Sequence, residues 1–181
     1  LTSDIYGFYT VMDRLQNIVA IQGSLREISV LHTSSGMLLS TQYGARRIAY
    51  EDEEWYHSVM AAGGKSVLHI NDDGHSDLFG TNTISFMRLM DVPDQKDTPN
   101  VLVLTLNRNV VQEMIQSLQQ TANTSVYLYS DDGQLVTGTD RAYPVDEWNA
   151  LGAGQTGRTA SGMLVWRMQS TQSGWSLVMI Q

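Results

Sequence analysis

The chain has 181 residues, of which 42% are hydrophobic, so it can bury a core in one domain or in two small ones. It carries 11 Lys and Arg against 19 Asp and Glu, and the formal net charge of -8 disfavours nucleic acid and anionic membrane surfaces as partners. The absence of cysteine excludes disulfides, thiol nucleophiles and thiolate metal sites. Because the sequence begins with Leu1 and ends inside a predicted strand, we expect it to be part of a longer protein.

The first half of the chain predicts a long helix, a hairpin, a second helix and three strands. Apolar residues at helical spacing from Ile5 to Ile21 predict a helix of roughly twenty residues, and a hairpin over residues 26–41 turns at Gly36. Residues 43–50 are predicted to be irregular, and acidic residues 51–54 to open a second helix, which ends at Gly63. Strands are predicted over 66–70, 83–92 and 101–106, the last a central strand covered on both faces.

The second half repeats this plan. It predicts a helix near residues 110–118, a hairpin that turns at Gly133, a short helix over 144–151 with Trp148, and strands over 162–169 and 175–180. A repeated helix and hairpin indicate two modules of the α+β class, each an antiparallel sheet with helices on one face. The predicted parts are a spine helix over 1–24, a module over 25–108 and a module over 109–181.

The order of these elements resembles a known family. A long helix, a hairpin, a helix that opens with E-E-W-Y, three strands, a helix, a second hairpin and a closing S-G-W-S-L-V-M-I resemble the double-Cache (tandem PAS-like) extracytoplasmic sensor domains. The closest likeness is to sensors of membrane histidine kinases paired with AraC-type response regulators. The resemblance covers the whole chain, and its motifs are the glycine-turn hairpin, the Trp55-Tyr56 pair and the Gly174-Trp175 strand.

This resemblance implies an extracellular signal-input domain of a two-component histidine kinase. The full-length protein would be anchored in the cell membrane by segments before Leu1 and after Gln181, and a homodimer is expected. Module 25–108 would lie far from the membrane and module 109–181 near it, with the spine helix beside both. The partner would be a small polar ligand bound in the distal module, or a solute-binding protein, and no cofactor is expected.

The family's amino-acid-binding members carry an R-x-W-Y motif, in which Arg binds the ligand carboxylate and a nearby Asp binds the ammonium group. Here Glu53 stands two positions before Trp55, and Ser58 stands two positions after Tyr56. Trp55 and Tyr56 carry over, whereas the Arg and the Asp do not. The identity of the ligand therefore stays open.

Five residues are candidates for ligand binding. Trp55 and Tyr56 have the aromatic faces and polar atoms that suit a polar ligand, although Trp55 could instead anchor its helix to the sheet. Arg88 lies in an apolar strand and needs an anionic ligand, a protein carboxylate or solvent. His69, at the end of the preceding strand, is either a ligand-binding group or a hydrogen-bonded structural one. Tyr43, which opens the segment 43–50, completes the set.

Metal binding and catalysis find little support. The loop with Asp72, Asp73, His75 and Asp77 is rich in oxygen ligands but lacks the spacing of a calcium loop, so we expect no metal there. There is no G-x-S-x-G, H-E-x-x-H, P-loop or dinucleotide motif, so this chain is not expected to be an enzyme. The main alternative is a protein-interaction or structural module without a small ligand. A chemoreceptor ectodomain or a small enzyme domain is less favoured.

Overall fold

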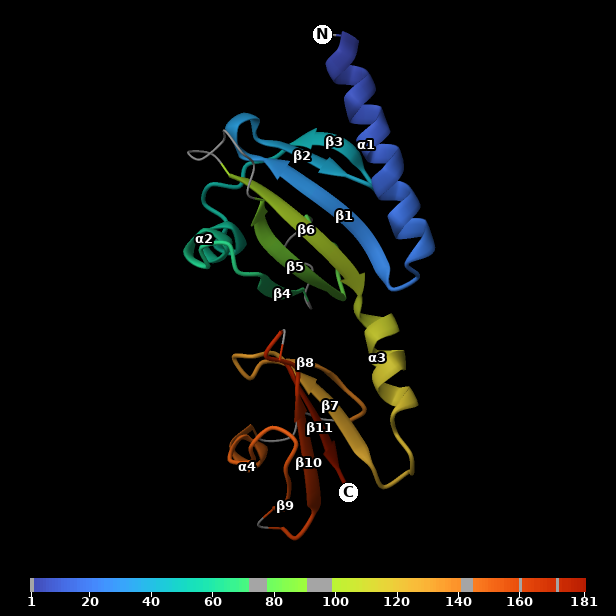
Figure 1. Ribbon diagram of the computed structural model, residues 1–181, viewed down its shortest axis with the longest axis vertical. Coiled ribbons are helices and arrows are strands. Elements are labelled where there is room, and N and C mark those ends of the chain that lie inside the picture. Colours follow the sequence, from blue (N-terminus) through green and yellow to red (C-terminus); the bar gives the residue numbers. More distant parts are fainter. Residues whose placement is uncertain (1, 72–77, 91–98, 141–144, 160, 172) are drawn as a thin grey trace. The chain divides into compact units, whose positions relative to one another are not determined.

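The chain forms two compact units, Leu1–Asn107 and Arg108–Gln181 (Figure 1). The computed structural model describes residues 2–71, 78–90, 99–140, 145–159, 161–171 and 173–181. Each unit contains one antiparallel sheet together with helices, so the predicted α+β class is confirmed.

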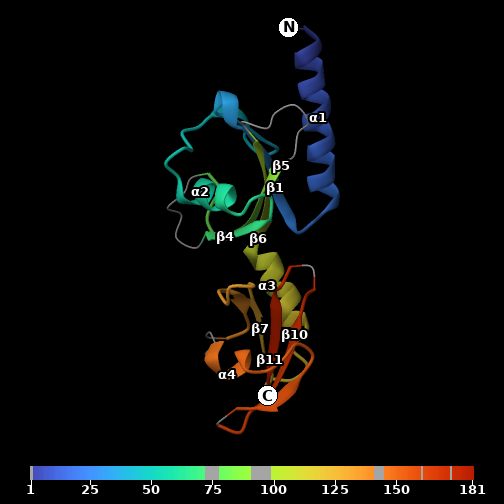
Figure 2. The ribbon, with the colours of Figure 1, turned by 60° about the vertical axis from the view of Figure 1, so that its left-hand side comes forward.

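The first unit contains a six-stranded sheet with the strand order β3-β2-β1-β6-β5-β4. Helix α1 packs against β1, while α2 packs against β4 and β5. Figure 2 shows these two helices on opposite faces of the sheet, so the prediction that the helices share one face is wrong. The elements are α1 (Thr2–Ile21), β1 (Leu25–His32), the 3-10 turn η1 (Thr33–Ser35), β2 (Met37–Ser40), β3 (Gly44–Arg47), α2 (Glu54–Ala61), β4 (Val67–Asn71), β5 (Thr83–Met90) and β6 (Asn100–Asn107).

Two local features of the first unit depart from the sequence-based expectations. Residues 43–50 are not wholly irregular, because β3 pairs with β2 along the edge of the sheet. Its sequence Gly-Ala-Arg-Arg has no apolar alternation that would predict a strand, although charged residues are common on edge strands. Helix α2 begins at Glu54 and not at residue 51. The expected hairpin turn at Gly36 is confirmed, and this residue has a φ of 66°, which glycine adopts readily.

The second unit repeats the sheet plan of the first. Its strand order is β8-β7-β11-β10-β9, so in both units the last strand lies beside the first strand, which also pairs with the second. The architectural repeat predicted from the sequence is therefore confirmed, whereas the short strand β9 was not predicted. The elements are α3 (Arg108–Ser117), β7 (Ser125–Tyr129), β8 (Leu135–Gly138), α4 (Val145–Asn149), β9 (Thr156–Arg158), β10 (Leu164–Gln169) and β11 (Ser176–Ile180).

Each unit has its own hydrophobic core. In the first unit, side chains from α2 and its flanking loops pack on one face of the sheet, and β6 lies centrally between β1 and β5, as predicted. In the second unit, Trp148 of α4 packs with side chains of β7, β10 and β11. These cores fix the faces on which a ligand site can form.

Candidate functional site

The candidate site lies on the face of the first sheet that α2 covers, which we call the α2 face. One half of this face is apolar and supports an aromatic cluster of Tyr50, Trp55, Tyr56 and Phe79. Beneath the cluster lie Leu31, Leu38, Met87, Val101 and Val103, all fully buried. The other half of the face is polar and is described below.

The aromatic cluster is held by edge-to-face contacts. Tyr56 lies between Tyr50 and Trp55, with ring centroids 4.8 Å and 5.9 Å apart, and Trp55 also meets Phe79 at 5.4 Å. The Tyr50 hydroxyl donates a hydrogen bond of 2.7 Å to the Thr33 carbonyl. Burial, together with the nearby Glu51 and Tyr56, raises the pKa of Tyr50, so it stays protonated and remains a donor at neutral pH. The cluster therefore attaches α2 firmly to the sheet.

The polar half of the α2 face is formed by the same strands further along their length. The pairing of neighbouring strands brings polar residues next to one another: Ser29 pairs with Ser40, Glu27 pairs with Thr105, and Thr105 pairs with Ser85. We use "polar half" for Glu27, Ser29, Ser40, Asn71, Thr83, Ser85 and Thr105, all of which are buried. Burying so many polar groups costs free energy unless they find partners, which makes this area unusual for a core.

Glu27 is the charged member of the polar half and is only 2% exposed. Its Oε1 atom accepts hydrogen bonds from the hydroxyls of Ser29 at 2.6 Å and Ser40 at 2.5 Å. Its Oε2 atom accepts no hydrogen bond from any residue that the structure describes, and none of those residues forms an ion pair with Glu27. The carboxylate thus has one oxygen in use and one available.

Arg26 lies beside Glu27 at an irregularity in the sheet. Leu25 pairs with Leu106 and Glu27 pairs with Thr105, so Arg26 is an extra residue, a β-bulge, and bulges redirect side chains. Its guanidinium lies against Gly80, where an added Cβ would stand 2.9 Å from Nη2 and 3.0 Å from Nη1. The Gly80 carbonyl accepts hydrogen bonds from Asn71 and from Thr83, which places the guanidinium at the polar half.

His69 connects the two halves of the α2 face. Its ring is 5.7 Å from that of Phe79, and in the sheet it faces Ser85 of the polar half. Burial lowers the pKa of His69 below its usual value of 6.5, an effect that the negative charge of Glu54 partly opposes. The imidazole is therefore neutral at pH 7 and can both donate and accept a hydrogen bond.

The structure brings together three of the five residues predicted for the site. Trp55, Tyr56 and His69 share the α2 face, whereas Arg88 is exposed on the opposite face, because it alternates with the buried Met87 along β5. Arg88 therefore does not join Trp55 and Tyr56 in one pocket. Tyr43 lies in the exposed turn between β2 and β3, with the Arg46 guanidinium 5.4 Å from its ring centroid. Whether any of the five binds a ligand stays a prediction.

Sequence reasoning missed Arg26 and Glu27. The visible signal was a pair of opposite charges within an otherwise apolar hairpin, but the bulge that directs Arg26 toward Gly80 depends on pairing with the distant strand β6. The acidic loop with Asp72, Asp73, His75 and Asp77 lies outside the described residues. Within the described part of the chain, no group of three His, Asp or Glu side chains could hold a metal ion.

In the second unit, the face of the sheet that α4 covers is apolar. Tyr127, Tyr129, Trp148, Val165 and Val178 fill it with a continuous apolar core. Two hollows, of about 280 and 290 Å³, lie mainly on the other face of that sheet and have no charged side chain in their walls. Their linings include Leu164, Trp166 and Met179 in one, and Leu128, Met168 and Leu177 in the other.

Solved structures with the same fold include an extracellular domain of a histidine kinase and the ligand-binding domains of chemoreceptors. The chain is similar to the extracellular domain of rpHK1S-Z16, which is assigned as a histidine kinase, with 14% identity, a TM-score of 0.73 and coverage of 94% of this chain and 76% of that one. It is also similar to the ligand-binding domain of the Campylobacter jejuni chemoreceptor Tlp3 in complex with 4-methylisoleucine, with 9% identity, a TM-score of 0.63 and coverage of 96% and 71%. A third is the ligand-binding domain of the amino acid chemoreceptor PctC of Pseudomonas aeruginosa PAO1 in complex with GABA, with 14% identity, a TM-score of 0.62 and coverage of 90% and 76%.

These likenesses define the class of fold. The chain has the fold of Cache-like extracellular sensor domains, as the order of its elements implied. No protein-family model matches the sequence, and no curated protein does. Across the described residues, no helix combines the length and the apolar character needed to cross a bilayer.

Proposed function

We propose that this chain is the extracellular ligand-sensing domain of a membrane-anchored two-component histidine kinase, and that it binds a small polar molecule on the α2 face of the first unit. The observation that carries this proposal is the polar half of that face, in which seven polar side chains are buried beside an aromatic cluster. Ligand sites in proteins combine these features, an apolar and aromatic wall with a few placed polar groups. The solved structures with this fold that bind amino acids and GABA also support a small polar ligand.

Ligand binding would act as a signal by favouring one of two conformations of the unit. A ligand can shift such an equilibrium only if it binds the two conformations with different affinities. In this proposal the first unit lies far from the membrane and the second near it, and the full-length protein is a homodimer. No cofactor is required, and the chain itself performs no catalysis.

A screen for ligand-induced stabilisation tests this proposal. A collection of amino acids, organic acids, amines and sugars is added to the chain, and thermal melts are recorded. A ligand at 100 times its dissociation constant adds about 2.7 kcal/mol of stability, which is readily detected. We expect at least one small polar compound to raise the melting temperature.

Variants then locate the binding site. Tyr56→Ala should weaken binding of the compound found, because it removes an aromatic wall and a hydroxyl from the α2 face. Arg88→Ala is the matched control, since Arg88 is exposed on the opposite face. Equal losses in both variants, or a loss in Arg88→Ala alone, would place the site elsewhere.

A chemoreceptor ectodomain is the second candidate, because Tlp3 and PctC have this fold as well. The two candidates differ in the output domain and not in the ligand site. Ligand-dependent autophosphorylation of the full-length protein in membranes would support the kinase, whereas ligand-dependent methylation of its cytoplasmic part would support the chemoreceptor.

A further inference from the structure

Part of one face of the second sheet is apolar and lies beside α3 rather than beneath it. Helix α3 packs mainly on β7 and β8, and Figures 1 and 2 show α3 and α4 on opposite sides of this sheet. Val165 and Val178 belong to the core beneath α4, so their neighbours along β10 and β11 point to the face with α3. We call the apolar side chains on that face the outer patch: they are Leu128, Leu164, Trp166, Met168, Leu177 and Met179.

Strand pairing makes the outer patch continuous. Trp166 pairs with Met179 in one row, and Met168, Leu177 and Leu128 form the next row across β10, β11 and β7. Met168 is 45% exposed, and the two hollows of about 280 and 290 Å³, which have no charged side chain in their walls, are lined by members of the patch. A contiguous apolar surface of this kind marks an interaction site.

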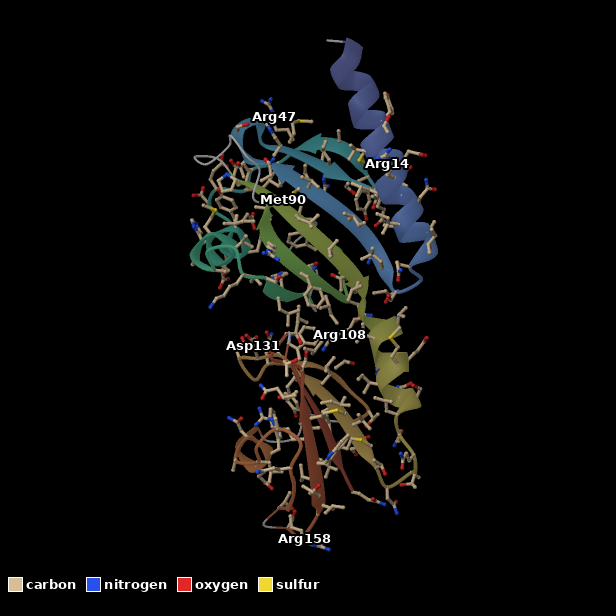
Figure 3. All side chains as sticks on the ribbon, viewed as in Figure 1. Arg14, Arg47, Met90, Arg108, Asp131 and Arg158 are labelled. Atoms are coloured by element: carbon tan, nitrogen blue, oxygen red, sulfur yellow. The ribbon has the colours of Figure 1, made fainter. Side chains whose placement is uncertain are left out.

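The outer patch has a positive end and a negative end. Arg158 pairs with Leu164 and therefore lies on the same face, at one end of the patch. Asp131 lies at the other end, against Gly174 in the turn between β10 and β11. Figure 3 shows Arg158 and Asp131 at opposite ends of the second unit. The Arg158 guanidinium donates a hydrogen bond of 2.9 Å to the Gly162 carbonyl, and neither residue forms an ion pair with any residue that the structure describes.

These charges indicate which partner fits the patch. They are separated by about six residues of extended strand, or about 20 Å, so a small ligand cannot reach both. The net charge of -8 repels an anionic membrane surface, and it also repels a second copy except where the contact is uncharged, as the patch is. A two-fold axis perpendicular to the line from Arg158 to Asp131 brings each of these residues to its opposite on the other copy. The patch is thus complementary to itself.

We propose that the outer patch is the surface at which two copies of this chain meet, with Arg158 of each copy paired to Asp131 of the other. The exposed side chains of Leu164 and Met168 in one copy pack into the hollows of the other. This assignment rests on the homodimer of the proposed function and names the surface that forms it.

The size of the outer patch sets the strength of this contact. The patch is about 20 Å long and spans three strands, a width of roughly 10 to 14 Å. Its area is therefore smaller than the ~800 Å² that each partner of a stable complex buries. Free chains should associate weakly, whereas copies held together in one membrane have a high effective concentration.

Helix α1 of the first unit is the competing surface. It leaves Val11, Ile18 and Ile21 exposed by 52%, 47% and 80%. Val11 and Ile18 lie two turns apart on one side of the helix and form a stripe one side chain wide. The outer patch is three strands wide and has charges that match across a two-fold axis, so we assign the contact to it.

The first experiment measures the mass of the chain by sedimentation equilibrium, at concentrations up to about 1 mM, where dissociation constants in the millimolar range are accessible. We expect the mean mass to rise toward that of a dimer. Met168→Glu should raise the dissociation constant at least ~10-fold, because it places a charge inside an apolar contact. Met60→Glu is the matched control, since Met60 is 39% exposed on α2 of the first unit. Ile18→Glu tests α1, and neither of these two variants should change the dissociation constant.

A charge exchange tests the pairing of Arg158 with Asp131. Arg158→Asp and Asp131→Arg should each raise the dissociation constant about 10-fold, because like charges then meet at two places in every dimer. The double variant restores both pairs with their signs exchanged and should recover most of the affinity. Recovery would not occur if either residue acted only on the fold of its own copy. Thermal melts of all variants report any loss of folding.

Four results would overturn the assignment. They are a chain that stays monomeric up to the highest concentration, a dimer that Met168→Glu does not weaken, a loss confined to Ile18→Glu, and a double variant no better than its single variants. In each case a small polar ligand that raises the melting temperature through the α2 face would still support the sensor function. Failure of this assignment is therefore distinct from failure of the proposed function.

Discussion

The two units share one strand topology but differ in the residues on the face of the sheet that α2 or α4 covers. In the second unit, Arg167 is fully engaged: its guanidinium donates to the Leu151 carbonyl at 2.8 Å, to Asn149 Oδ1 at 3.3 Å and to Ser176 Oγ at 3.2 Å, and it lies 5.0 Å from the Trp148 ring centroid. In the first unit, Arg26 has no such partner among the described residues. Arg167 is therefore part of the core of its unit, whereas no such bonds to described residues hold Arg26.

The side chains of the first strand in each unit explain this difference. On β7 the inward residues are Tyr127 and Tyr129, and Gly138 leaves space for the Tyr127 ring, since a Cβ there would stand 2.6 Å from Cδ1. On β1 the corresponding face carries Leu31, then Ser29 and Glu27, which are shorter or charged. Large aromatic side chains fill the face of the second unit, whereas part of the face of the first unit is lined by buried polar side chains that are hydrogen-bonded to one another or to the backbone.

Both units nevertheless anchor a helix by one buried tryptophan, and removing either should give the largest effect. Trp55 is 4% exposed and Trp148 is 2% exposed. We expect Trp55→Ala and Trp148→Ala each to lower the free energy of unfolding by about 3 to 5 kcal/mol, because a large cavity is left in each core. Denaturant unfolding followed by circular dichroism measures this loss. Trp166→Ala, at a half-buried position, is the control, and an equal loss there would contradict the argument.

The arginine comparison can be tested directly with paired variants. Arg167→Met should destabilise the protein by about 2 kcal/mol, because hydrogen bonds from a charged donor and a contact with the Trp148 ring are lost. Arg26→Met should change the stability of the ligand-free protein by less than about 0.5 kcal/mol, as expected for a side chain without bonded partners. Equal losses in the two variants would mean that Arg26 is as structural as Arg167.

The support under Arg26 can be tested at Gly80. Gly80→Ala introduces a Cβ at a φ of 72° and 2.9 Å from the Arg26 guanidinium, so we expect a loss of about 1 to 2 kcal/mol from backbone strain and a further loss from displacement of the Arg26 side chain. Gly44→Ala is the matched control, because Gly44 has a φ of 74° but nothing within 4 Å of the added Cβ. It should share only the loss from backbone strain. Denaturant unfolding of both variants measures the difference, and equal losses would show that the contact between Gly80 and Arg26 does not matter for stability.

The smallest expected effect is a pH dependence of the first unit that comes from His69. Its lowered pKa means that the unfolded chain takes up the proton below pH 6.5 while the folded chain resists it, so stability falls as the pH falls. His69→Gln should remove this part of the pH dependence between about pH 7 and 5.5. The lowered pKa of Asp132, which is due mainly to its hydrogen bond from Ser130, acts only near and below its usual value of 3.8 and does not interfere. A variant with the same pH profile as the parent would show that His69 is not the group responsible.

The sequence by itself determined the α+β class, the repeated helix and hairpin, the glycine turns at Gly36 and Gly133, and the short helix that carries Trp148. These features depend on local periodicity and on the backbone freedom of glycine, which neighbouring residues report directly. The sequence also led to Trp55, Tyr56 and His69, and the structure places these three on one face of the first sheet.

Only the tertiary structure decided which charged residues belong to that face. Arg88 and Met87 are neighbours in β5, yet they point to opposite faces, and the register with β4 and β6 determines which face each one meets. The bulge at Arg26 and the approach of its guanidinium to Gly80 join segments more than fifty residues apart. A shift of one residue in the pairing of such distant strands would turn each side chain to the other face of the sheet. Local periodicity does not determine that pairing.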